Sequence, residues 1–395
     1  MTSPPTPRRA ILVLALASFV GAANLRVCDA LLPQIAQELA VTVGTAAAMV
    51  TAFAVAYGLC QIVVGPLGDA RGKLRMVVLG SIWAGVATII GAAMPSLAPL
   101  VVFRFLAGAG AAAVIPLAIA WIGDVVAYER RQAVLAQYIS GQILGIVFGQ
   151  AAGGAFAALI GWRATLMLLG VLHIAAGLLL VGERRRLTVG VPTPMPPRWK
   201  EAAVAAYRVL RQPWPRVVLT SVFIEGMAMF GALAYIGADL HARFEVGLGA
   251  VGALLGSFGG GALLFAVSAN RLVPRLGQPL LAALGTLVLA SSYLTLAIMP
   301  ALWLAAPAIA GIGLGFYMLH NTLQVNATQM TPEARGLAVS LFALALFIGQ
   351  SVGVALAAPI VDRYGARPVF AAAAAVLVVI GFWFRRQLIK RAAAG

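Results

Sequence analysis

The chain has 395 residues, of which 62% are hydrophobic and only 10% are charged, and its mean hydropathy is +0.97. Too few polar side chains are present to cover a soluble protein of this length, so the composition excludes a soluble globular protein and indicates an integral membrane protein. The formal net charge of +16 makes nucleic acid a candidate partner until the positions of the bases are considered.

Twelve apolar stretches follow one another along the chain. A helix of about 20 apolar residues crosses a hydrocarbon core of roughly 30 Å, so each stretch is long enough to span a membrane. The first stretch is too long for a cleaved signal peptide, and we take it as the first helix. The stretches cover 10–34, 44–66, 74–94, 98–122, 133–158, 164–182, 215–237, 247–269, 278–298, 301–325, 336–358 and 367–384.

The basic residues divide unevenly between the two sides of these spans. With the N-terminus in the cytoplasm, 22 of the 28 Lys and Arg residues fall on the inner side and four fall in outer loops. This distribution follows the positive-inside rule and predicts a multi-pass protein of a bacterial inner membrane with both termini cytoplasmic. The basic excess then reflects orientation and contact with anionic membrane lipids, and we expect no nucleic-acid partner.

Between the second and third spans lies the charged segment GPLGDARGKLR, residues 65–75. Its glycines predict a tight reversal and close helix packing, and one acid lies among three bases that could pair with it. We interpret the segment as a gating loop, in which Asp69 stabilises the state closed toward the cytoplasm. The candidate gating residues are Gly65, Asp69, Gly72, Lys73 and Arg75.

This segment resembles the loop signature of the major facilitator superfamily, G-x-L-a-D-r-x-G-r-k. Gly65, Leu67, Asp69, Gly72, Lys73 and Arg75 match the signature, and Ala70 stands where a base is frequent. The resemblance implies an all-α membrane fold of twelve helices in two six-helix pseudo-repeats. It also implies alternating access of a site near the middle of the membrane.

Charged residues within the spans are candidates for proton coupling, because each costs about 2.5–3.5 kcal/mol on insertion scales. Asp29 and Arg104 lie at similar depths in the first and fourth spans, so an ion pair between them is possible. Arg26 lies three residues from Asp29 on the same helix face. VVFRFLAGAGAAA also resembles the superfamily's fourth-helix signature, which implies a proton-coupling role for Arg104; a permanent structural salt bridge is the alternative.

The fifth span carries glycine at every fourth position, at Gly141, Gly145, Gly149 and Gly153. Such a stripe allows another backbone to approach closely. It also resembles the fifth-helix signature of the antiporter branch, although Gln150 stands where that signature has proline. Gln142 and Gln150 either face the substrate cavity or form hydrogen bonds between helices.

A long polar interruption from Glu183 to Arg216 divides the chain into halves that repeat each other. Gly149-Gln150 recurs as Gly349-Gln350, at an offset of 200 residues. We predict an N-terminal bundle over 1–183, a cytoplasmic linker over 184–214 and a C-terminal bundle over 215–395. Within the linker, RWKEAAVAAYRVLR is either an amphipathic helix on the inner leaflet or a solvated segment.

Glu225 lies near the middle of the seventh span and is our first candidate for the proton carrier of the C-terminal half. A carboxyl group there favours its neutral form and could exchange a proton at working pH. The alternative is an inert carboxyl neutralised by an unseen neighbour. His320 in the tenth span shares a helix face with Gln324, which suits either a polar substrate lining or a structural histidine.

The remaining candidates for a substrate cavity combine polar and aromatic side chains. Such a lining suits an amphipathic or aromatic molecule and also a sugar. The tenth and eleventh spans resemble those of sugar and nucleoside exporters. The class of cargo stays open among drugs, nucleosides, sugars and metabolites. The substrate-cavity candidates are Gln142, Gln150, Met229, Phe230, Tyr235, Tyr317, His320, Asn321 and Gln324.

Motifs of other chemistry are absent from the sequence. It contains no P-loop, HExxH or paired CxxC pattern, and Cys28 and Cys60 form no metal or disulfide pattern. We therefore predict a monomeric proton-coupled exporter of small molecules, without cofactor or metal and with the proton gradient as its energy source. Uptake of a sugar, nucleoside or metabolite is the alternative, and a membrane enzyme or channel is a remote one.

Overall fold

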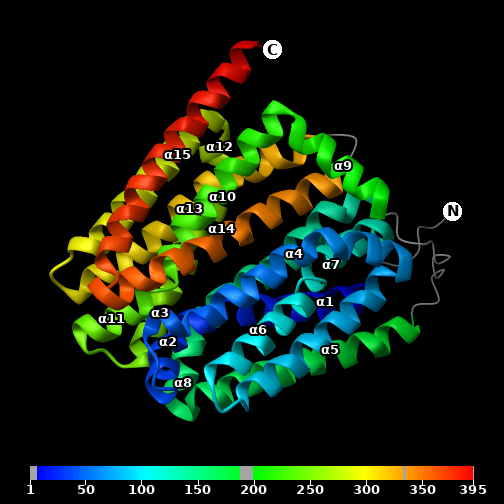
Figure 1. Ribbon diagram of the computed structural model, residues 1–395. Coiled ribbons are helices and arrows are strands. Elements are labelled where there is room, and N and C mark those ends of the chain that lie inside the picture. The colour runs from blue at the N-terminus through cyan, green and yellow to red at the C-terminus, as the bar shows by residue number, and fades with distance from the viewer. Residues whose placement is uncertain (1–6, 187–198, 332–334, 395) are drawn as a thin grey trace.

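The computed structural model describes residues 7–186, 199–331 and 335–394 (Figure 1). The described residues form helices and no strands, which confirms the predicted all-α fold class. The proline-rich stretch 192–197 of the linker lies outside the described residues.

Twelve membrane crossings are confirmed in this part of the chain. Ten helical segments are long and apolar enough to span a membrane, and two of these, of 57 and 51 residues, contain a break. The breaks lie at Gly161, with φ 81°, and Gly277, with φ 65°, a left-handed conformation that glycine adopts without strain. Each of these two segments therefore makes two crossings.

Some crossings consist of two helices and others of one. The helices are α1 (Arg8–Arg26), α2 (Cys28–Glu38), α3 (Val43–Ala46), α4 (Ala48–Arg71), α5 (Lys73–Ala92), α6 (Leu97–Ala111), α7 (Val114–Val125), α8 (Tyr128–Arg186), α9 (Trp199–Arg211), α10 (Pro213–Leu233), α11 (Ile236–Phe244), α12 (Leu248–Ile298), the 3-10 turn η1 (Leu302–Leu304), α13 (Ala305–Gln329), α14 (Arg335–Tyr364) and α15 (Arg367–Ala394).

Because the number of crossings is even, both chain ends lie at the same end of the molecule, which we call the terminal face (Figure 1). Helix α9 also lies at this face. The opposite end, which we call the far face, carries α3 and the turns that lead into α12 and α13. Helices α1–α8 pack mainly against one another, as do α10–α15, and we call these two sets the N-terminal and C-terminal bundles.

The glycine stripe packs against α1, as the predicted close approach requires. A Cβ on any of Gly145, Gly149 and Gly153 would collide with the backbone or side chains of that helix. The four glycines at 141, 145, 149 and 153 meet Ala15, Phe19, Ala23 and Val27 in turn. The stripe therefore fixes the spacing and register of the first and fifth crossings.

The C-terminal bundle repeats this packing at the offset found in the sequence. Gly349 and Gly353 of α14 lie against the backbone of Phe223 and Met227 in α10. These pairs are the counterparts, 200 residues on, of the contacts at Ala23 and Val27. The repeat thus reflects equivalent helix pairs in the two bundles.

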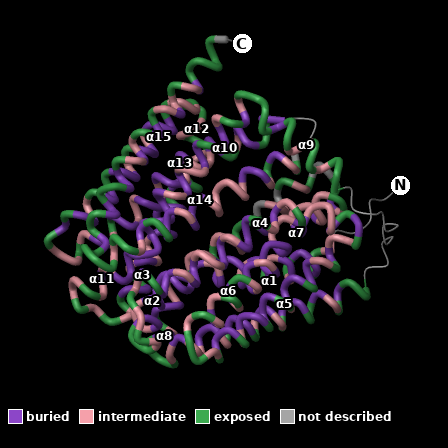
Figure 2. Tube along the Cα trace, viewed as in Figure 1, coloured by how far each residue is buried: buried purple, intermediate pink, exposed green. Residues whose placement is uncertain are grey.

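The two bundles contact each other in the half of the molecule next to the far face. Gly154 packs against Gly252, and the rings of Tyr57 and Phe347, at mid-crossing, are 4.5 Å apart. The hydrogen bonds of Arg26 and Thr42 to the C-terminal bundle and the Tyr57–Phe347 contact lie from mid-crossing to the far face, and the ribbons of the two bundles diverge toward the terminal face (Figure 1). The structure is therefore closed at the far face. Exposed residues gather in the connecting turns, at the chain ends and on the outer helix faces (Figure 2).

The segment between α4 and α5 differs from the predicted loop. Gly65 and Gly68 lie within α4, and only Gly72, with φ 91°, departs from helical geometry. Gly68 packs against Leu117 of α7, so its lack of a Cβ serves helix packing. The prediction of a glycine-bracketed turn is wrong because the glycines upstream of Gly72 continue the helix.

Candidate functional site

A buried ion pair lies in the first crossing, near the junction of α1 and α2. Arg26 Nη1 is 3.4 Å from Asp29 Oδ2, and the exposed fractions of the two side chains are 3% and 0%. Pro33 provides no N–H for the carbonyl group of Asp29, and Gly237 of α11 packs against that carbonyl. The possible ion pair between Asp29 and Arg104 is not formed, because Arg26, one helical turn away, is the partner of Asp29.

Arg104 instead joins the fourth crossing to the first. Its guanidinium group donates hydrogen bonds to the Asn24 side-chain oxygen, at 2.6 Å, and to the Asn24 carbonyl oxygen, at 3.1 Å. Asn24 in turn donates to Thr88 Oγ1 at 2.9 Å, and the Arg104 guanidinium lies 4.4 Å from the centre of the Phe53 ring. These contacts make Arg104 a link among four crossings of the N-terminal bundle.

Arg26 also contacts the other bundle. Its guanidinium group lies 4.0 Å from the centre of the Phe230 ring in α10, and its Nη2 donates to Gln350 Oε1 in α14 at 3.5 Å. A desolvated guanidinium over an aromatic face interacts with it favourably. The Arg26–Asp29 pair therefore lies at the interface of the two bundles.

The repeated glutamines lie beside this pair. Gln150 and Gln350 are both buried, and Gln150 lies next to Asp29 without a hydrogen bond of normal geometry to a described residue. Gln350 Nε2 and Asp29 Oδ1 likewise have no partner among the described residues. Buried polar atoms are normally satisfied, so this group is a candidate for binding water or cargo. In the sequence, the feature that pointed to Gln350 was the internal repeat, which aligns Gln350 with Gln150.

A second buried acid lies in the C-terminal bundle. Glu225 of α10 is fully enclosed, and its Oε2 lies 2.8 Å from Nδ1 of His320 in α13. The His320 side chain is 12% exposed, and Glu225 Oε1 has no hydrogen-bond partner among the described residues. The neighbour of Glu225 that the sequence could not name is His320, which the fold brings from 95 positions away.

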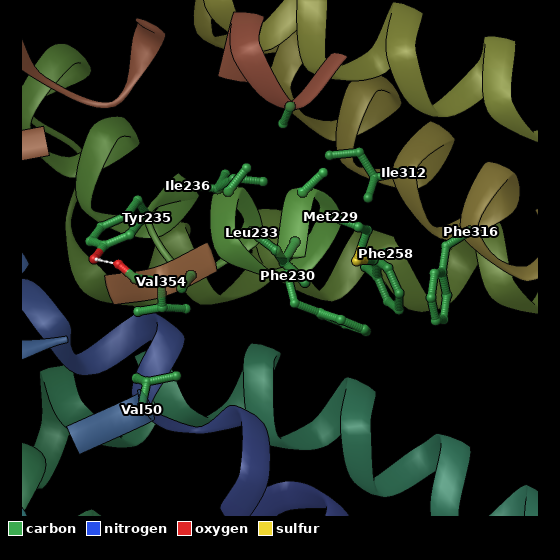
Figure 3. Packing of buried hydrophobic residues seen from close by; sticks show 14 of the residues in the cluster. Val50, Met229, Phe230, Leu233, Tyr235, Ile236, Phe258, Ile312, Phe316 and Val354 are labelled. Atoms are coloured by element: carbon green, nitrogen blue, oxygen red, sulfur yellow. Dashed lines mark hydrogen bonds between the residues drawn. The ribbon is translucent and has the colours of Figure 1, made fainter. Parts of the chain in front are cut away.

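Aromatic rings connect the two buried pairs. His320 stacks on Phe316 with ring centres 4.6 Å apart, and Phe316 makes an edge contact with Phe230 at 5.2 Å. Because Phe230 lies under Arg26, a continuous path of contacts runs from Asp29 to Glu225. Figure 3 shows Phe230 and Phe316 at the side of the core cluster that faces helices of the N-terminal bundle.

Several predicted cavity residues are enclosed in this state. The Tyr235 hydroxyl donates to the Val354 carbonyl oxygen at 2.8 Å (Figure 3), and the Met229 carbonyl accepts a hydrogen bond from the Tyr293 hydroxyl. Both side chains, like Phe230, belong to the buried core cluster and do not line an open space. Their predicted contact with cargo would require the far face to open. Gln142, Tyr317 and Asn321 are half-buried, and Gln324 is exposed.

The charged residues of the α4–α5 segment interact within the N-terminal bundle. Lys73 Nζ lies 2.6 Å from Asp124 Oδ2 of α7 and 3.4 Å from Asp69 Oδ1. The Asp69 side chain is 67% exposed, so it is available for other partners. Asp124 lies half-exposed at the end of α7.

The sequence analysis missed an acid at the far face. Asp362, near the end of α14, accepts hydrogen bonds from Thr42 Oγ1 at 2.6 Å and from the Gly44 backbone N–H at 2.7 Å. Thr42 is the N-cap of α3, so a carboxylate of one bundle satisfies the Gly44 N–H in the first turn of a helix in the other. The sequence feature that pointed to Asp362 was an acidic residue at the end of a span. Its partner Thr42 lies 320 positions away in the sequence.

Sequence comparison identifies the family of this twelve-crossing chain with buried ion pairs. The sequence profile of the Major Facilitator Superfamily matches residues 14–354. The chain belongs to the Major Facilitator Superfamily. It is therefore a transporter and not an enzyme, as predicted from the α4–α5 signature and the repeat.

Relatives and solved structures agree with this assignment. The chain is 26% identical to the uncharacterised MFS-type transporter YceJ of Bacillus subtilis, over 83% of each protein. It is 28% identical to a chloramphenicol resistance protein of Streptomyces lividans, over 92% of this chain and 93% of that one. A bacterial homologue of the human lysosomal transporter Spinster, in an inward-facing conformation, shares the fold with a TM-score of 0.77, 19% identity and coverage of 98% and 99%.

Proposed function

We propose that this transporter is a proton-coupled exporter of small molecules in a bacterial inner membrane, with the terminal face in the cytoplasm. The excess of Lys and Arg at that face supports the orientation. In this orientation the structure, closed at the far face, is the inward-facing state. The similarity to a chloramphenicol resistance protein supports export.

The observation that carries the proposal is the Glu225–His320 pair. With one proton shared between carboxylate and imidazole, the pair is neutral and compatible with its enclosed position. Loss of this proton leaves a buried negative charge, and gain of a second leaves a positive one. The pair can therefore exchange a proton with solvent through the 12% exposed His320 in a reaction coupled to conformation.

Asp29 is less suited to carry the proton in this state. Its partner Arg26 remains charged under all physiological conditions, so protonation of Asp29 would leave an uncompensated cation in the interior. We assign the Arg26–Asp29 pair to the bundle interface, where it holds the far halves together through Phe230 and Gln350. Arg104 supports the same crossing through Asn24 and would then affect coupling through the position of α1.

The cargo proposed from the interface is an amphipathic or aromatic small molecule. Phe230, Phe316, the amide group of Gln150 and the unpartnered Nε2 of Gln350 offer ring contacts and hydrogen bonds once the interface opens. Chloramphenicol, an aromatic amide, is the first probe, and a sugar, nucleoside or metabolite, exported or taken up, is the alternative. The test is uptake of labelled chloramphenicol into inverted vesicles with an acidic interior, compared with vesicles lacking the protein.

Asp362→Asn is expected to weaken closure at the far face. The substitution replaces charge-assisted hydrogen bonds to Gly44 N and Thr42 Oγ1 by weaker ones, a loss of about 1–2 kcal/mol. The ratio of inward-facing to outward-facing molecules should therefore fall by about tenfold. Spin labels at Ser96, in the turn before α6, and at Ala242, in the last turn of α11, lie at the far face of the two bundles and report this ratio as a distance distribution. An unchanged distribution would show that Asp362 does not act as a clamp.

Asp69→Asn is expected to shift the same ratio in the opposite direction. In the inward-facing state Asp69 pairs with Lys73 alone, at 3.4 Å on an exposed surface, so its loss there costs less than about 1 kcal/mol. In the outward-facing state, the proposed ion pairs between Asp69 and bases across the closed terminal face would be lost entirely. The spin labels at Ser96 and Ala242 should therefore report a larger fraction of inward-facing molecules. A smaller or unchanged fraction contradicts the predicted gating role.

A further inference from the structure

A groove lies on the outer surface of the C-terminal bundle, in the half next to the terminal face. Its volume is about 460 Å³, and its walls come from α9, α10 and α14. Its lining is apolar except for one hydroxyl group, and it lies apart from the Glu225–His320 and Arg26–Asp29 pairs. The lining residues are Leu210, Leu219, Thr220, Phe223, Ile224, Leu341, Leu344 and Ala345.

The groove faces away from the interface of the bundles. On α14, Leu341 and Gln350 are separated by nine residues, or two and a half helical turns, and so lie on opposite sides of the helix. Gln350 reaches Arg26 at the interface, so Leu341 points outward. Ala345 shares its face with Leu356, which is 61% exposed. The groove therefore opens toward the hydrocarbon region that surrounds the protein.

Basic groups mark the mouth of the groove. Arg216 at the start of α10 donates from Nε to the carbonyl oxygen of Leu210, a lining residue, at 2.7 Å. This bond places the guanidinium group at the end of the groove nearest the terminal face. Arg211, exposed and next to Leu210, adds a second positive charge, and Arg208 on the preceding turn adds a third.

Helix α9 carries the surface that leads into the groove. Trp199, Tyr207 and Leu210 lie on one exposed stripe of this helix, and the exposed bases Lys200 and Arg211 flank the stripe on one side. An exposed apolar stripe beside a row of bases is the arrangement of a helix that lies in the headgroup region of a membrane. The stripe is continuous with the groove through Leu210.

We propose that this groove binds one anionic phospholipid of the leaflet at the terminal face, with phosphatidylglycerol as the fitting class. One acyl chain lies between α10 and α14 against Phe223 and Leu344, and the phosphate group is bound by Arg216 and Arg211. The hydrogen bond to Leu210 fixes the Arg216 guanidinium by its Nε and directs its two terminal amino groups to the ligand.

The test measures lipid retention by the purified full-length protein in a neutral detergent. Native mass spectrometry after titration with dioleoylphosphatidylglycerol or dioleoylphosphatidylcholine counts the molecules retained. We expect one phosphatidylglycerol bound more tightly than the rest. Arg216→Gln should weaken it about fivefold, because one base near a membrane surface contributes about that factor. Arg8→Gln, which removes an exposed base of the N-terminal bundle at the same face, is the matched control and should have no effect.

Filling the groove tests the acyl-chain site independently of charge. Leu344→Trp occupies the groove from α14, and Thr220→Trp does so from an exposed position that tolerates a larger side chain. Either variant should abolish the tight phosphatidylglycerol site without a change in the bases. Equal losses in Arg216→Gln and Arg8→Gln, or equal retention of phosphatidylcholine, overturns the proposal in favour of a diffuse lipid shell. Retention of the tight site in both filled variants overturns it by placing the site outside the groove.

Discussion

Glu225→Gln is expected to abolish transport driven by a proton gradient while the protein remains folded. Glutamine has nearly the same shape and can still form a hydrogen bond with His320 Nδ1, so the packing around α10 and α13 should survive. It cannot release or accept a proton at working pH. Uptake of chloramphenicol into inverted vesicles with an acidic interior should fall to the background of protein-free vesicles.

Two further measurements separate loss of coupling from loss of structure. The unfolding temperature of Glu225→Gln should match that of the unmodified protein, and Glu245→Gln, which changes an exposed acid in the turn before α12, should leave transport intact. Infrared difference spectra across a pH step require no cargo and should lose a carboxyl band only in Glu225→Gln. Undiminished gradient-driven uptake in this variant would exclude the Glu225–His320 pair as the proton carrier.

Arg26→Met is expected to cause the largest loss of stability among single substitutions of the charged residues. The variant leaves Asp29 as a buried charge without its ion-pair partner, and breaking a buried pair in this way costs about 3–5 kcal/mol. It also removes the contacts with Phe230 and Gln350 that join the bundles. The free energy of unfolding in detergent measures this effect.

The double variant Arg26→Met, Asp29→Asn distinguishes the lone charge from the lost packing. Removing the charge of Asp29 should restore at least half of the stability lost in Arg26→Met, because the remaining amide needs only hydrogen-bond partners. Arg9→Met, which removes an exposed base from Glu183 while Arg186 stays 3.5 Å from the same carboxylate, is the matched control and should cost less than about 1 kcal/mol. Failure of the double variant to recover stability would show that the Arg26 contacts across the bundles matter more than the charge.

The functional consequence of Arg26→Met differs from that of Glu225→Gln. Loss of the Phe230 and Gln350 contacts weakens closure of the far halves, so surviving molecules should populate the outward-facing state more than the unmodified protein does. Glu225→Gln removes the exchangeable proton and leaves both interfaces unchanged. The spin-label distances at the far face should therefore shift in Arg26→Met, whereas in Glu225→Gln they should no longer change with pH.

Local features of the sequence were sufficient for the crossings and for part of their packing. The number of spans depends on runs of apolar residues long enough to cross a membrane, which is a property of neighbouring residues. The glycine stripe from Gly141 to Gly153 predicted a close helix contact because spacing by four places residues on one face of a helix. The recurrence of Gly149-Gln150 as Gly349-Gln350 marked the repeat, and in the structure Gly349 and Gly353 make contacts equivalent to those of Gly149 and Gly153.

The partners of the charged residues were decided only by the tertiary structure. Glu225 meets His320 and Asp362 meets Thr42, contacts that join positions 95 and 320 apart in the sequence. Helix periodicity states which residues share a face, but it does not state which other helix that face will meet, or at what depth. Similar depth made an ion pair between Asp29 and Arg104 possible, whereas the structure pairs Asp29 with Arg26 on its own crossing. The sequence by itself determined the membrane fold, the repeat and the candidate charges, because these follow from local hydropathy and spacing. The tertiary structure decided the pairs and the closed far face, because they depend on contacts between helices distant in the chain.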